Sequence, residues 1–480
     1  MTLPAGTPTG LFIDGKWGDG SAGSFAVLNP STGEQITSVP RAGLDDLDRA
    51  LAAAAAAQPD WAATAPRERS EVLRRAFELM ISRREEIAFL MSLEMGKSLT
   101  DARGEVTYAA EFFRWFSEEA VRIDGALRIA PSGANRILTF RRAVGVALLL
   151  TPWNFPAAMA TRKIGPAFAA GCAVVLKPAG ETPLTALLLA QLLTEAGAPA
   201  GTVNVLTTDR PGELVAAALV DDRVRKLSFT GSTGVGRTLL KQAADRIINT
   251  SLELGGNAPF VVLDDADLDA AVEGAMVAKM RNGGQACTAA NRFLVQEGIA
   301  EAFAAKLAAR MGSLRVGPGT EEQTQLGPMI NKRAVDGIAE KVDSAVAAGA
   351  RVVIGGARGD GRGFFYQPTV LADVPRDCAV ATEEIFGPVA PILAVRDDDD
   401  AVSIANASEM GLTGYVYAGS LARGLRVCER LEVGMIGLNR GLVSDPAAPF
   451  GGVKQSGLGR EGGYEGIDAY LETTYVAASW

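Results

Sequence analysis

The 480-residue sequence contains no histidine. Imidazole is the usual general base of serine and cysteine hydrolases and a common zinc ligand, so its absence excludes every mechanism that depends on it. A catalyst built from this chain must therefore rely on carboxylate, thiol, lysine, tyrosine or backbone groups.

Cysteine is also scarce, and none of the four cysteines belongs to a CxxC pair that would indicate a zinc or redox site. So few cysteines in so long a chain are typical of a reducing compartment rather than of a disulfide framework. Residues 1–10 have neither the basic nor the apolar region of a signal peptide. The sequence therefore predicts a cytoplasmic protein without a bound metal.

Long apolar stretches and an excess of positive charge are missing as well. The longest run of apolar or glycine residues, 167–176, is about half of the roughly 20 residues that span a bilayer. The 47 basic residues are outnumbered by 56 acidic ones, whereas a nucleic-acid-binding surface needs clustered positive charge. We therefore expect a small-molecule partner rather than a membrane or a nucleic acid.

Apolar runs and helical patterns alternate along the chain. Residues 144–150, 172–176 and 226–230 are expected to form short buried strands, and residues 183–196 and 235–244 to form helices. Such alternation predicts an α/β fold in which helices cover parallel sheets.

A second series of strands and helices is expected from residue 260 onward, so two α/β domains in tandem are the simplest interpretation. The tail 469–480 alternates apolar and polar residues, which predicts a late strand. Such a strand could join the edge of another sheet.

The turn GSTGVG at 231–236 follows an expected strand and opens an expected helix. That context favours a phosphate at a helix N-terminus, where unpaired N–H groups and the helix dipole are positive. The turn does not match GxGxxG, and no acidic residue follows in the usual position. By itself it is equally compatible with a nucleotide site and with a plain tight turn.

Cys287 lies in the segment NGGQACTAANR, 282–292. A lone cysteine is more often a small buried hydrophobe than a catalyst. The small residues around Cys287, however, leave room for a substrate, and a helix N-terminus beside it would favour the nucleophilic thiolate.

Attack of a thiol on a carbonyl needs a hydrogen-bond donor for the oxyanion and a base that activates water. Asn154, between two prolines in TPWNFP, is a candidate donor. Glu253, in LELGGNAP, is a candidate base because an apolar setting raises the pKa of a carboxylate. Each also has a structural interpretation, Asn154 as a turn residue and Glu253 as a salt-bridge partner.

Seven segments occur in a characteristic order: TPWNFP, KPAGETP, FTGSTGVG, LELGGNAP, GQACTAANR, EEIFGPV and PFGGVKQSGLGREGG. In this order and spacing they resemble the aldehyde dehydrogenase superfamily, over nearly the whole chain. The resemblance implies three parts and a homodimer or homotetramer. The parts are a Rossmann-like nicotinamide cofactor-binding domain at 1–122 and 142–252, a catalytic domain at 253–462, and a small β oligomerisation arm at 123–141 and 463–480.

The resemblance also implies a role for each motif. Cys287 is the expected nucleophile, Glu253 the general base, and Asn154 the oxyanion donor beside the Cys287 backbone N–H. Hydride transfer to the nicotinamide leaves a thioester, which water hydrolyses with help from Glu253. The presence of this glutamate separates the chain from CoA-acylating relatives, and Ala289 replaces the second cysteine of a redox switch that some members carry.

Cofactor contacts are implied at a larger set of positions: Trp153, Asn154, Lys177, Gly180, Gly231, Ser232, Leu254, Glu384 and Phe386. Lys177 and Glu384 are expected at the two riboses, and Gly231 and Ser232 at the pyrophosphate. Phe386 is expected near the nicotinamide.

Three stretches, 158–172, 279–287 and 437–452, are most similar to succinate-semialdehyde dehydrogenases. The resemblance implies that Arg162, Arg281 and Ser444 hold the distal carboxylate of the substrate. A guanidinium can pair with a carboxylate through two hydrogen bonds, although either arginine could instead form an internal ion pair. Another aldehyde, neutral or anionic (a sulfonated lactaldehyde, for example), and a catalytically silent structural relative remain as alternatives.

The choice between NAD and NADP depends on the segment after Lys177. Relatives that prefer NADP often have a small hydroxyl residue at the position of Gly180, where it can hold the 2′-phosphate. Gly180 cannot do so, and the carboxylate of Glu181 is close by. The sequence therefore favours NAD slightly over NADP.

Overall fold

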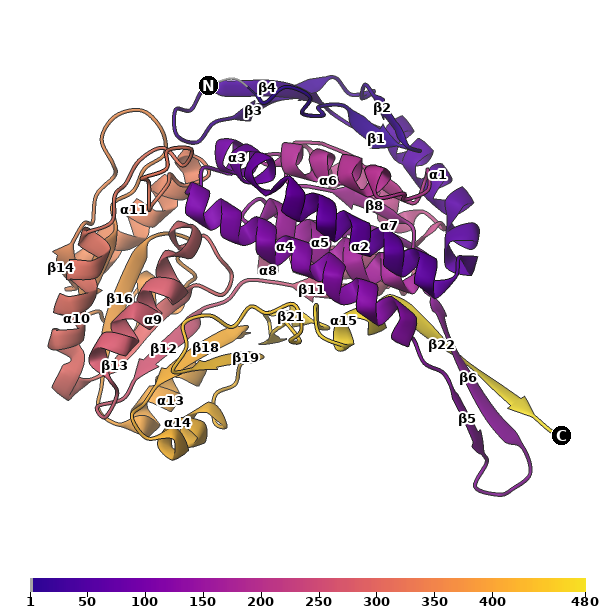
Figure 1. Ribbon diagram of the computed structural model, residues 1–480. Coiled ribbons are helices and arrows are strands. Elements are labelled where there is room, and N and C mark those ends of the chain that lie inside the picture. The colour runs from indigo at the N-terminus through magenta and orange to yellow at the C-terminus, as the bar shows by residue number, and fades with distance from the viewer. Residues whose placement is uncertain (1–2) are drawn as a thin grey trace.

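The computed structural model describes residues 3–480. Residues 1 and 2, which belong to the expected cofactor-binding range 1–122 and to the N-terminal segment 1–10, lie outside the described part. Two helix-covered sheets lie beside each other, and a narrow three-stranded arm extends away from them (Figure 1). The α/β class with two largely parallel sheets and a small β arm is confirmed, whereas the exact domain boundaries stay a prediction.

The first sheet has eight strands in the order β2-β1-β9-β8-β7-β10-β11-β21. Its five central strands are parallel to one another and lie in the order β9-β8-β7-β10-β11. The strands are β1 (Leu11–Ile13), β2 (Lys16–Gly18), β7 (Val146–Leu150), β8 (Val174–Lys177), β9 (Val203–Val205), β10 (Val224–Thr230), β11 (Asn249–Glu253) and β21 (Gly457–Leu458). The three strands expected here from apolar runs are confirmed, with ends displaced by one or two residues.

The order of the parallel strands reverses between β7 and β10. From β7 the chain adds β8 and β9 on one side, and then returns to add β10 and β11 on the other. In open parallel sheets, ligands bind outside the carboxyl ends of the strands at such a switch point. The segments that follow β7 and β10 therefore lie where a ligand is expected.

Helices pack on both faces of this sheet (Figure 1). On one face α4 packs against α2 and α5, which brings an N-terminal helix close to the loop after β7. The helices of this part are α1 (Leu44–Ala63), α2 (Pro66–Ser82), α3 (Arg84–Met95), α4 (Leu99–Glu119), α5 (Pro156–Ala170), α6 (Pro183–Glu195), α7 (Pro211–Val220) and α8 (Thr233–Ala244). The two helices expected at 183–196 and 235–244 are α6 and α8.

The second sheet has seven strands in the order β14-β15-β16-β13-β12-β18-β19, all parallel except β14. They are β12 (Ala258–Val262), β13 (Ala290–Gln296), β14 (Arg351–Ile354), β15 (Thr369–Ala372), β16 (Val389–Val395), β18 (Thr413–Tyr417) and β19 (Met435–Leu438). Its helices are α9 (Leu268–Met280), α10 (Glu297–Gly312), α11 (Lys332–Ala347), α12 (Ala379–Thr382), α13 (Asp398–Asn406) and α14 (Leu421–Cys428).

A short link joins the two sheets directly. Glu253 is the last residue of β11 in the first sheet, and Ala258 is the first residue of β12 in the second. Cys287 lies before β13, the neighbour of β12. Residues of both sheets therefore meet at one boundary.

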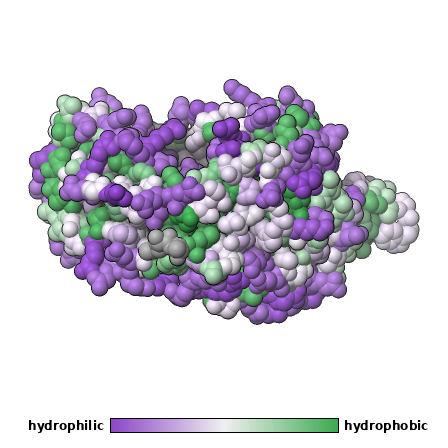
Figure 2. Space-filling view, turned by 90° about the horizontal axis from the view of Figure 1, so that it is seen from above, coloured by the Kyte–Doolittle hydropathy of each residue, from purple (hydrophilic) through white to green (hydrophobic). Residues whose placement is uncertain are grey.

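The arm is an antiparallel sheet of β5 (Ala126–Ile129), β6 (Arg136–Ala143) and β22 (Leu471–Ala478). The late strand expected in the tail is thus confirmed, and its partner is β6. Large apolar side chains are exposed on the arm, among them Leu127, Phe140 and Tyr475. Figure 2 shows the arm as a pale to green projection, whereas purple hydrophilic residues predominate on the rest of that face.

Shorter elements complete the chain: the hairpin of β3 (Ser24–Leu28) and β4 (Gln35–Pro40), the pair of β17 (Met410–Gly411) and β20 (Val453–Lys454), α15 (Glu465–Asp468), and the 3₁₀ turns η1 (Ala120–Arg122) and η2 (Arg281–Gly284). Within residues 3–480, no helix is long and apolar enough to cross a membrane. Nor does that part of the chain contain a group of acidic or cysteine side chains arranged to hold a metal ion.

Candidate active site

A cavity of about 210 Å³ lies at the switch point of the first sheet and is closed on its other side by the second. The loop after β7 contributes Trp153 and Asn154 to its lining, and the turn after β10 contributes Gly231 and Ser232. The remaining predicted residues in the lining are Glu253, Leu254, Cys287, Glu384 and Phe386. The structure therefore brings together residues from five separate motifs.

Cys287 lies in a turn between η2 and β13, and no helix begins there. The condition under which a helix dipole would favour its thiolate is therefore not met. Burial raises the pKa of the thiol to about 12; Arg162 and Arg281 oppose this rise, whereas Glu384 and Glu253 add to it. Cys287 is therefore a neutral thiol at pH 7, and its proton must be removed before or during attack.

The raised pKa of Cys287 predicts how alkylation depends on pH. Because only the thiolate reacts, the rate of inactivation by iodoacetamide should rise about tenfold per pH unit between pH 7 and 10. The measurement is best made on a Cys428→Ala variant, which removes the other partly exposed thiol. A rate that levels off at pH 8 would contradict the neutral thiol.

Asn154 is held from two sides. Its backbone carbonyl accepts hydrogen bonds from Lys97 Nζ at 2.7 Å and from Asn282 Nδ2 at 2.8 Å. Its side-chain Nδ2 donates one hydrogen to the carbonyl of Gln285 at 3.0 Å. The second hydrogen of this amide is free to reach a substrate oxygen, and its orientation is fixed by the first.

Lys97 is itself fixed by a fully buried ion pair with Glu105 on α4. Glu105 also accepts the backbone N–H groups of Ala157 and Ala158 at 2.9 and 3.2 Å, in the first turn of α5. The loop that carries Asn154 is therefore tied both to α4 and to the helix that follows it.

Glu253 is 2% exposed, and its Oε2 has no hydrogen-bond partner. It forms no ion pair within residues 3–480, so the structure does not support the salt-bridge interpretation. Burial, reinforced by Glu461, raises its pKa well above the usual range, against the opposite effect of Arg162 and Lys163. A side chain on Gly451 would place its Cβ 2.9 Å from Glu253 Oε1, so this glycine leaves the room that the carboxylate needs.

The two arginines expected at the substrate have different environments. Arg162, on α5, is 1% exposed and contacts the carboxylate of Glu461 at 2.5 Å. It therefore forms an internal ion pair, which was the alternative to binding the carboxylate of the substrate. Arg281 forms no ion pair within the described chain; it contacts Thr288 Oγ1 at 3.5 Å and stacks over Phe155 at 5.1 Å. Arg281 therefore retains most of its hydrogen-bonding capacity.

Tyr108 is a residue of this region that the sequence did not indicate. Its hydroxyl faces Arg162 and Ser444 and is influenced by the charge of Arg281, yet it forms no hydrogen bond of regular geometry. Tyr108 lies on α4, beside the apolar Ala109 and Phe112. A tyrosine on a largely apolar helix face is the one signal that could have drawn attention to it.

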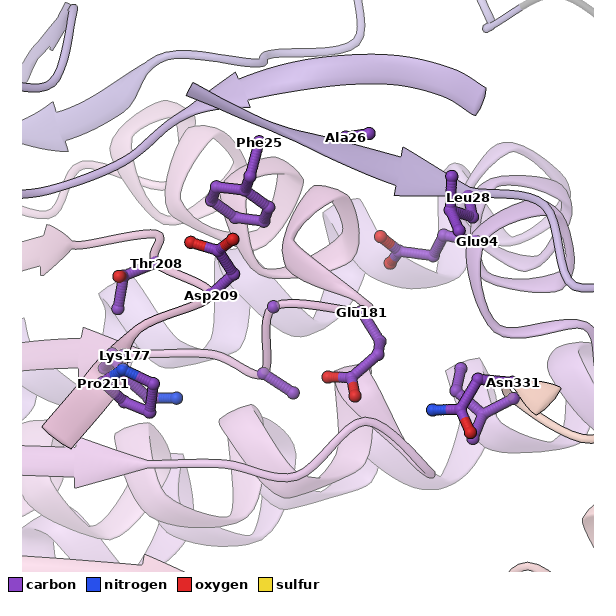
Figure 3. Close-up of a pocket in the computed structure, with 13 residues that line it drawn as sticks. Phe25, Ala26, Leu28, Glu94, Lys177, Glu181, Thr208, Asp209, Pro211 and Asn331 are labelled. Atoms are coloured by element: carbon purple, nitrogen blue, oxygen red, sulfur yellow. The ribbon is translucent and has the colours of Figure 1, made fainter. Parts of the chain in front are cut away.

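A second and larger cavity, of about 540 Å³, begins where β8 ends (Figure 3). Lys177 and Gly180 line it, together with Glu181 and Asp209. A third cavity shares Glu181 with this one and Trp153, Glu384 and Phe386 with the first. The three form a continuous trough from Gly180 to Cys287.

The trough has the groups that a dinucleotide requires. The part of it that contains Cys287 also reaches the N-terminus of α8, whose first N–H groups are unpaired within the helix. Lys177 is buried without an ion-pair partner in the described chain, and burial lowers its pKa to about 8. Glu384 accepts the Gly256 N–H at 3.3 Å, and burial raises its pKa to about 7.

The ring of Phe386 meets that of Trp153 edge to face at 5.4 Å. Both rings line the part of the trough that is next to Cys287. An aromatic wall of this kind suits a flat heteroaromatic ring. The resemblance implies that the nicotinamide ring lies at this place, beside Phe386.

Comparisons with known proteins agree with this geometry. The model of the aldehyde dehydrogenase family matches residues 17–476. A succinate-semialdehyde dehydrogenase of Paenarthrobacter nicotinovorans is 57% identical over 92% of this chain and 98% of that protein. A glutarate-semialdehyde dehydrogenase of Pseudomonas putida is 50% identical over 98% and 97%. The crystal structure of a succinate-semialdehyde dehydrogenase from Burkholderia pseudomallei matches with a TM-score of 0.97 and 46% identity over 100% of both chains.

Proposed function

Because the chain belongs to the aldehyde dehydrogenase family, and is thus an NAD(P)-dependent enzyme that oxidises an aldehyde to an acid, we propose that its substrate is succinate semialdehyde and its product succinate. The observation that supports this substrate best is the unpaired Arg281 beside a cavity that already contains the nucleophile and the base. A buried or half-buried cation without a partner favours an anionic ligand.

The reaction begins at Cys287. Its Sγ bonds to the aldehyde carbon once the thiol proton is lost, and the carbonyl oxygen becomes an oxyanion. The free hydrogen of Asn154 Nδ2 and the Cys287 backbone N–H hold that oxygen. A nicotinamide cofactor, which Lys177, Glu384 and the rings of Trp153 and Phe386 would hold, would supply the hydride acceptor, so that a thioester remains on Cys287.

Hydrolysis of the thioester depends on Glu253. With a raised pKa, its carboxylate is a strong enough base to take a proton from water as that water attacks the thioester carbon. Release of succinate returns Cys287 to the thiol. No step requires imidazole, which this chain lacks.

The distal carboxylate of the substrate would lie among Arg281, Tyr108 and Ser444. Arg281 offers N–H groups that no carboxylate of the described chain uses, and the Tyr108 hydroxyl lacks a regular partner. Arg162 would contribute mainly charge, since Glu461 already pairs with it.

Replacement of Arg281 by alanine tests the substrate assignment. We expect kcat/KM for succinate semialdehyde to fall roughly 10- to 100-fold, the cost of one charge-assisted hydrogen bond to a carboxylate, while kcat/KM for butanal changes little. Both aldehydes have four carbons, so butanal is a matched neutral substrate. Arg315→Ala, at an arginine that does not line the cavity, is the control. Equal losses on both substrates would contradict a carboxylate site at Arg281.

Glutarate semialdehyde is a second candidate, supported by the relative that is 50% identical over nearly the full length. It has the same charge and one more carbon. The kcat/KM values of the two semialdehydes on the native enzyme decide between them.

The preferred cofactor that we propose is NAD, because Gly180 offers no hydroxyl to a 2′-phosphate and Glu181 lines the same cavity. We also propose a homodimer or homotetramer in which the arm contacts a second subunit. The exposed Leu127, Phe140 and Tyr475 on three neighbouring strands support that contact.

A further inference from the structure

Another part of the chain packs closely against Gly180. A Cβ built on Gly180 would lie 3.2 Å from Asp209 Cα and 3.2 Å from the carbonyl oxygen of Thr208. Asp209 follows β9, which is the neighbour of β8 in the sheet. The segment that contains Thr208 and Asp209 therefore leaves only tight room for a side chain at position 180, and it brings a carboxylate of its own to the cavity.

Arg41 holds the Asp209 carboxylate in place. Its Nε donates to Asp209 Oδ1 at 2.6 Å and its second terminal nitrogen to Oδ2 at 3.1 Å. The other terminal nitrogen donates to the carbonyl oxygen of Ala22 at 3.0 Å. The Arg41 guanidinium lowers the pKa of Asp209, so this carboxylate stays ionised at neutral pH.

Asp209 lines the cavity, but Arg41 does not. Figure 3 shows the Asp209 carboxylate under Phe25 on one side, with Lys177 and Glu181 on the other. A further acid, Glu94, is occupied by the Leu184 and Thr185 N–H groups at the start of α6. At this end of the trough Lys177 is therefore the one cation in the lining, and it shares the cavity with the carboxylate of Glu181 and with that of Asp209, which is paired with Arg41.

We propose that Asp209, held by Arg41, is the residue that selects NAD over NADP in this chain. This proposal rests on the assignment of the trough from Gly180 to Cys287 as the cofactor site. The Asp209 carboxylate accepts a hydrogen bond from a ribose hydroxyl of NAD, and its charge, together with that of Glu181, repels the dianionic 2′-phosphate of NADP. Dinucleotide-binding folds commonly use an acidic residue at the ribose in this way, although here it comes from a different loop.

The test is the binding of NAD and NADP, without aldehyde, to the native enzyme and to Asp209→Asn, measured by isothermal titration calorimetry. The substitution keeps the size of the side chain and removes its charge. We expect the native enzyme to bind NAD at least tenfold more tightly, and the ratio of the two Kd values to shift about tenfold toward NADP in the variant. The preference of the native enzyme should also weaken with added salt.

Asp221→Asn is the matched control, because Asp221 also pairs with an arginine, Arg223, in the same part of the chain and lies outside the cavity. It should leave the Kd ratio unchanged. An unchanged ratio in Asp209→Asn, or a native enzyme that binds NADP more tightly, would overturn the proposal.

A double variant, Asp209→Asn with Arg41→Gln, separates repulsion by Asp209 from capture of the phosphate by a released Arg41. Repulsion predicts that the gain in NADP affinity persists in the double variant, whereas its complete loss would overturn the mechanism proposed here. A wrong substrate assignment would appear differently, as the absence of succinate semialdehyde turnover with a normal ratio of cofactor affinities.

Discussion

The Cys287→Ala variant is expected to bind NAD as tightly as the native enzyme and to oxidise no aldehyde at a measurable rate. Without the sulfur, no thiohemiacetal forms and hydride transfer has no activated donor. Loss of a covalent nucleophile lowers turnover on the order of 10⁵-fold or more. Cys287 lines the cavity with its side chain only partly buried, so its truncation removes little packing.

The measurement combines NADH absorbance at high enzyme concentration with titration of NAD binding. Cys428→Ala is the matched control, because Cys428 is the other partly buried thiol and lies on α14, outside the cavity. Turnover in Cys287→Ala within a factor of ten of the native rate would contradict the covalent mechanism. Loss of NAD binding together with activity would indicate instead that the variant had misfolded.

The Glu253→Gln variant should release one equivalent of NADH per active site and then nearly stop. Glutamine has the shape of glutamate but cannot take a proton from water, so the thioester forms and persists. General-base catalysis contributes about 10²- to 10⁴-fold, and the steady-state rate should fall by that factor. Stopped-flow absorbance measures the burst, and mass spectrometry of the quenched protein detects the acyl group on Cys287.

Loss of the burst itself would assign Glu253 to formation of the thioester rather than to its hydrolysis. Glu213→Gln, at an exposed residue of α7, serves as the control and should behave like the native enzyme. The activity of the native enzyme should rise with pH over a range above that of an ordinary carboxylate, because burial raises the pKa of Glu253 and only its ionised form can take a proton from water. The small rate that remains in Glu253→Gln should lose this dependence.

Much of the fold could be predicted because its signals are local. Strands such as β7 and β8 are short runs of apolar residues that are buried on both faces, and α6 begins at Pro183 and ends shortly before Gly197. Whether a helix N-terminus lies beside Cys287 could not be predicted from the sequence. Its segment contains Asn282 and Gly283 with positive φ, which turn the chain before any regular helix can form.

The sequence by itself determined which chemistry is available. The absence of histidine leaves carboxylate, thiol, lysine, tyrosine and backbone groups as catalysts, and the ordered motifs around Asn154, Glu253 and Cys287 indicate the family and its fold. These conclusions depend on residue type and on order along the chain, and neither requires a contact between distant segments.

Only the tertiary structure decided how each charged group is used. Arg162 and Arg281 are the same residue type, yet Glu461, almost three hundred positions further along the chain, pairs with one and leaves the other free. Likewise, Asp209 supplies the carboxylate that position 180 lacks, because β8 and β9 are neighbours in the sheet. Ion pairing and burial depend on distances in space, which are set when segments remote in sequence pack together.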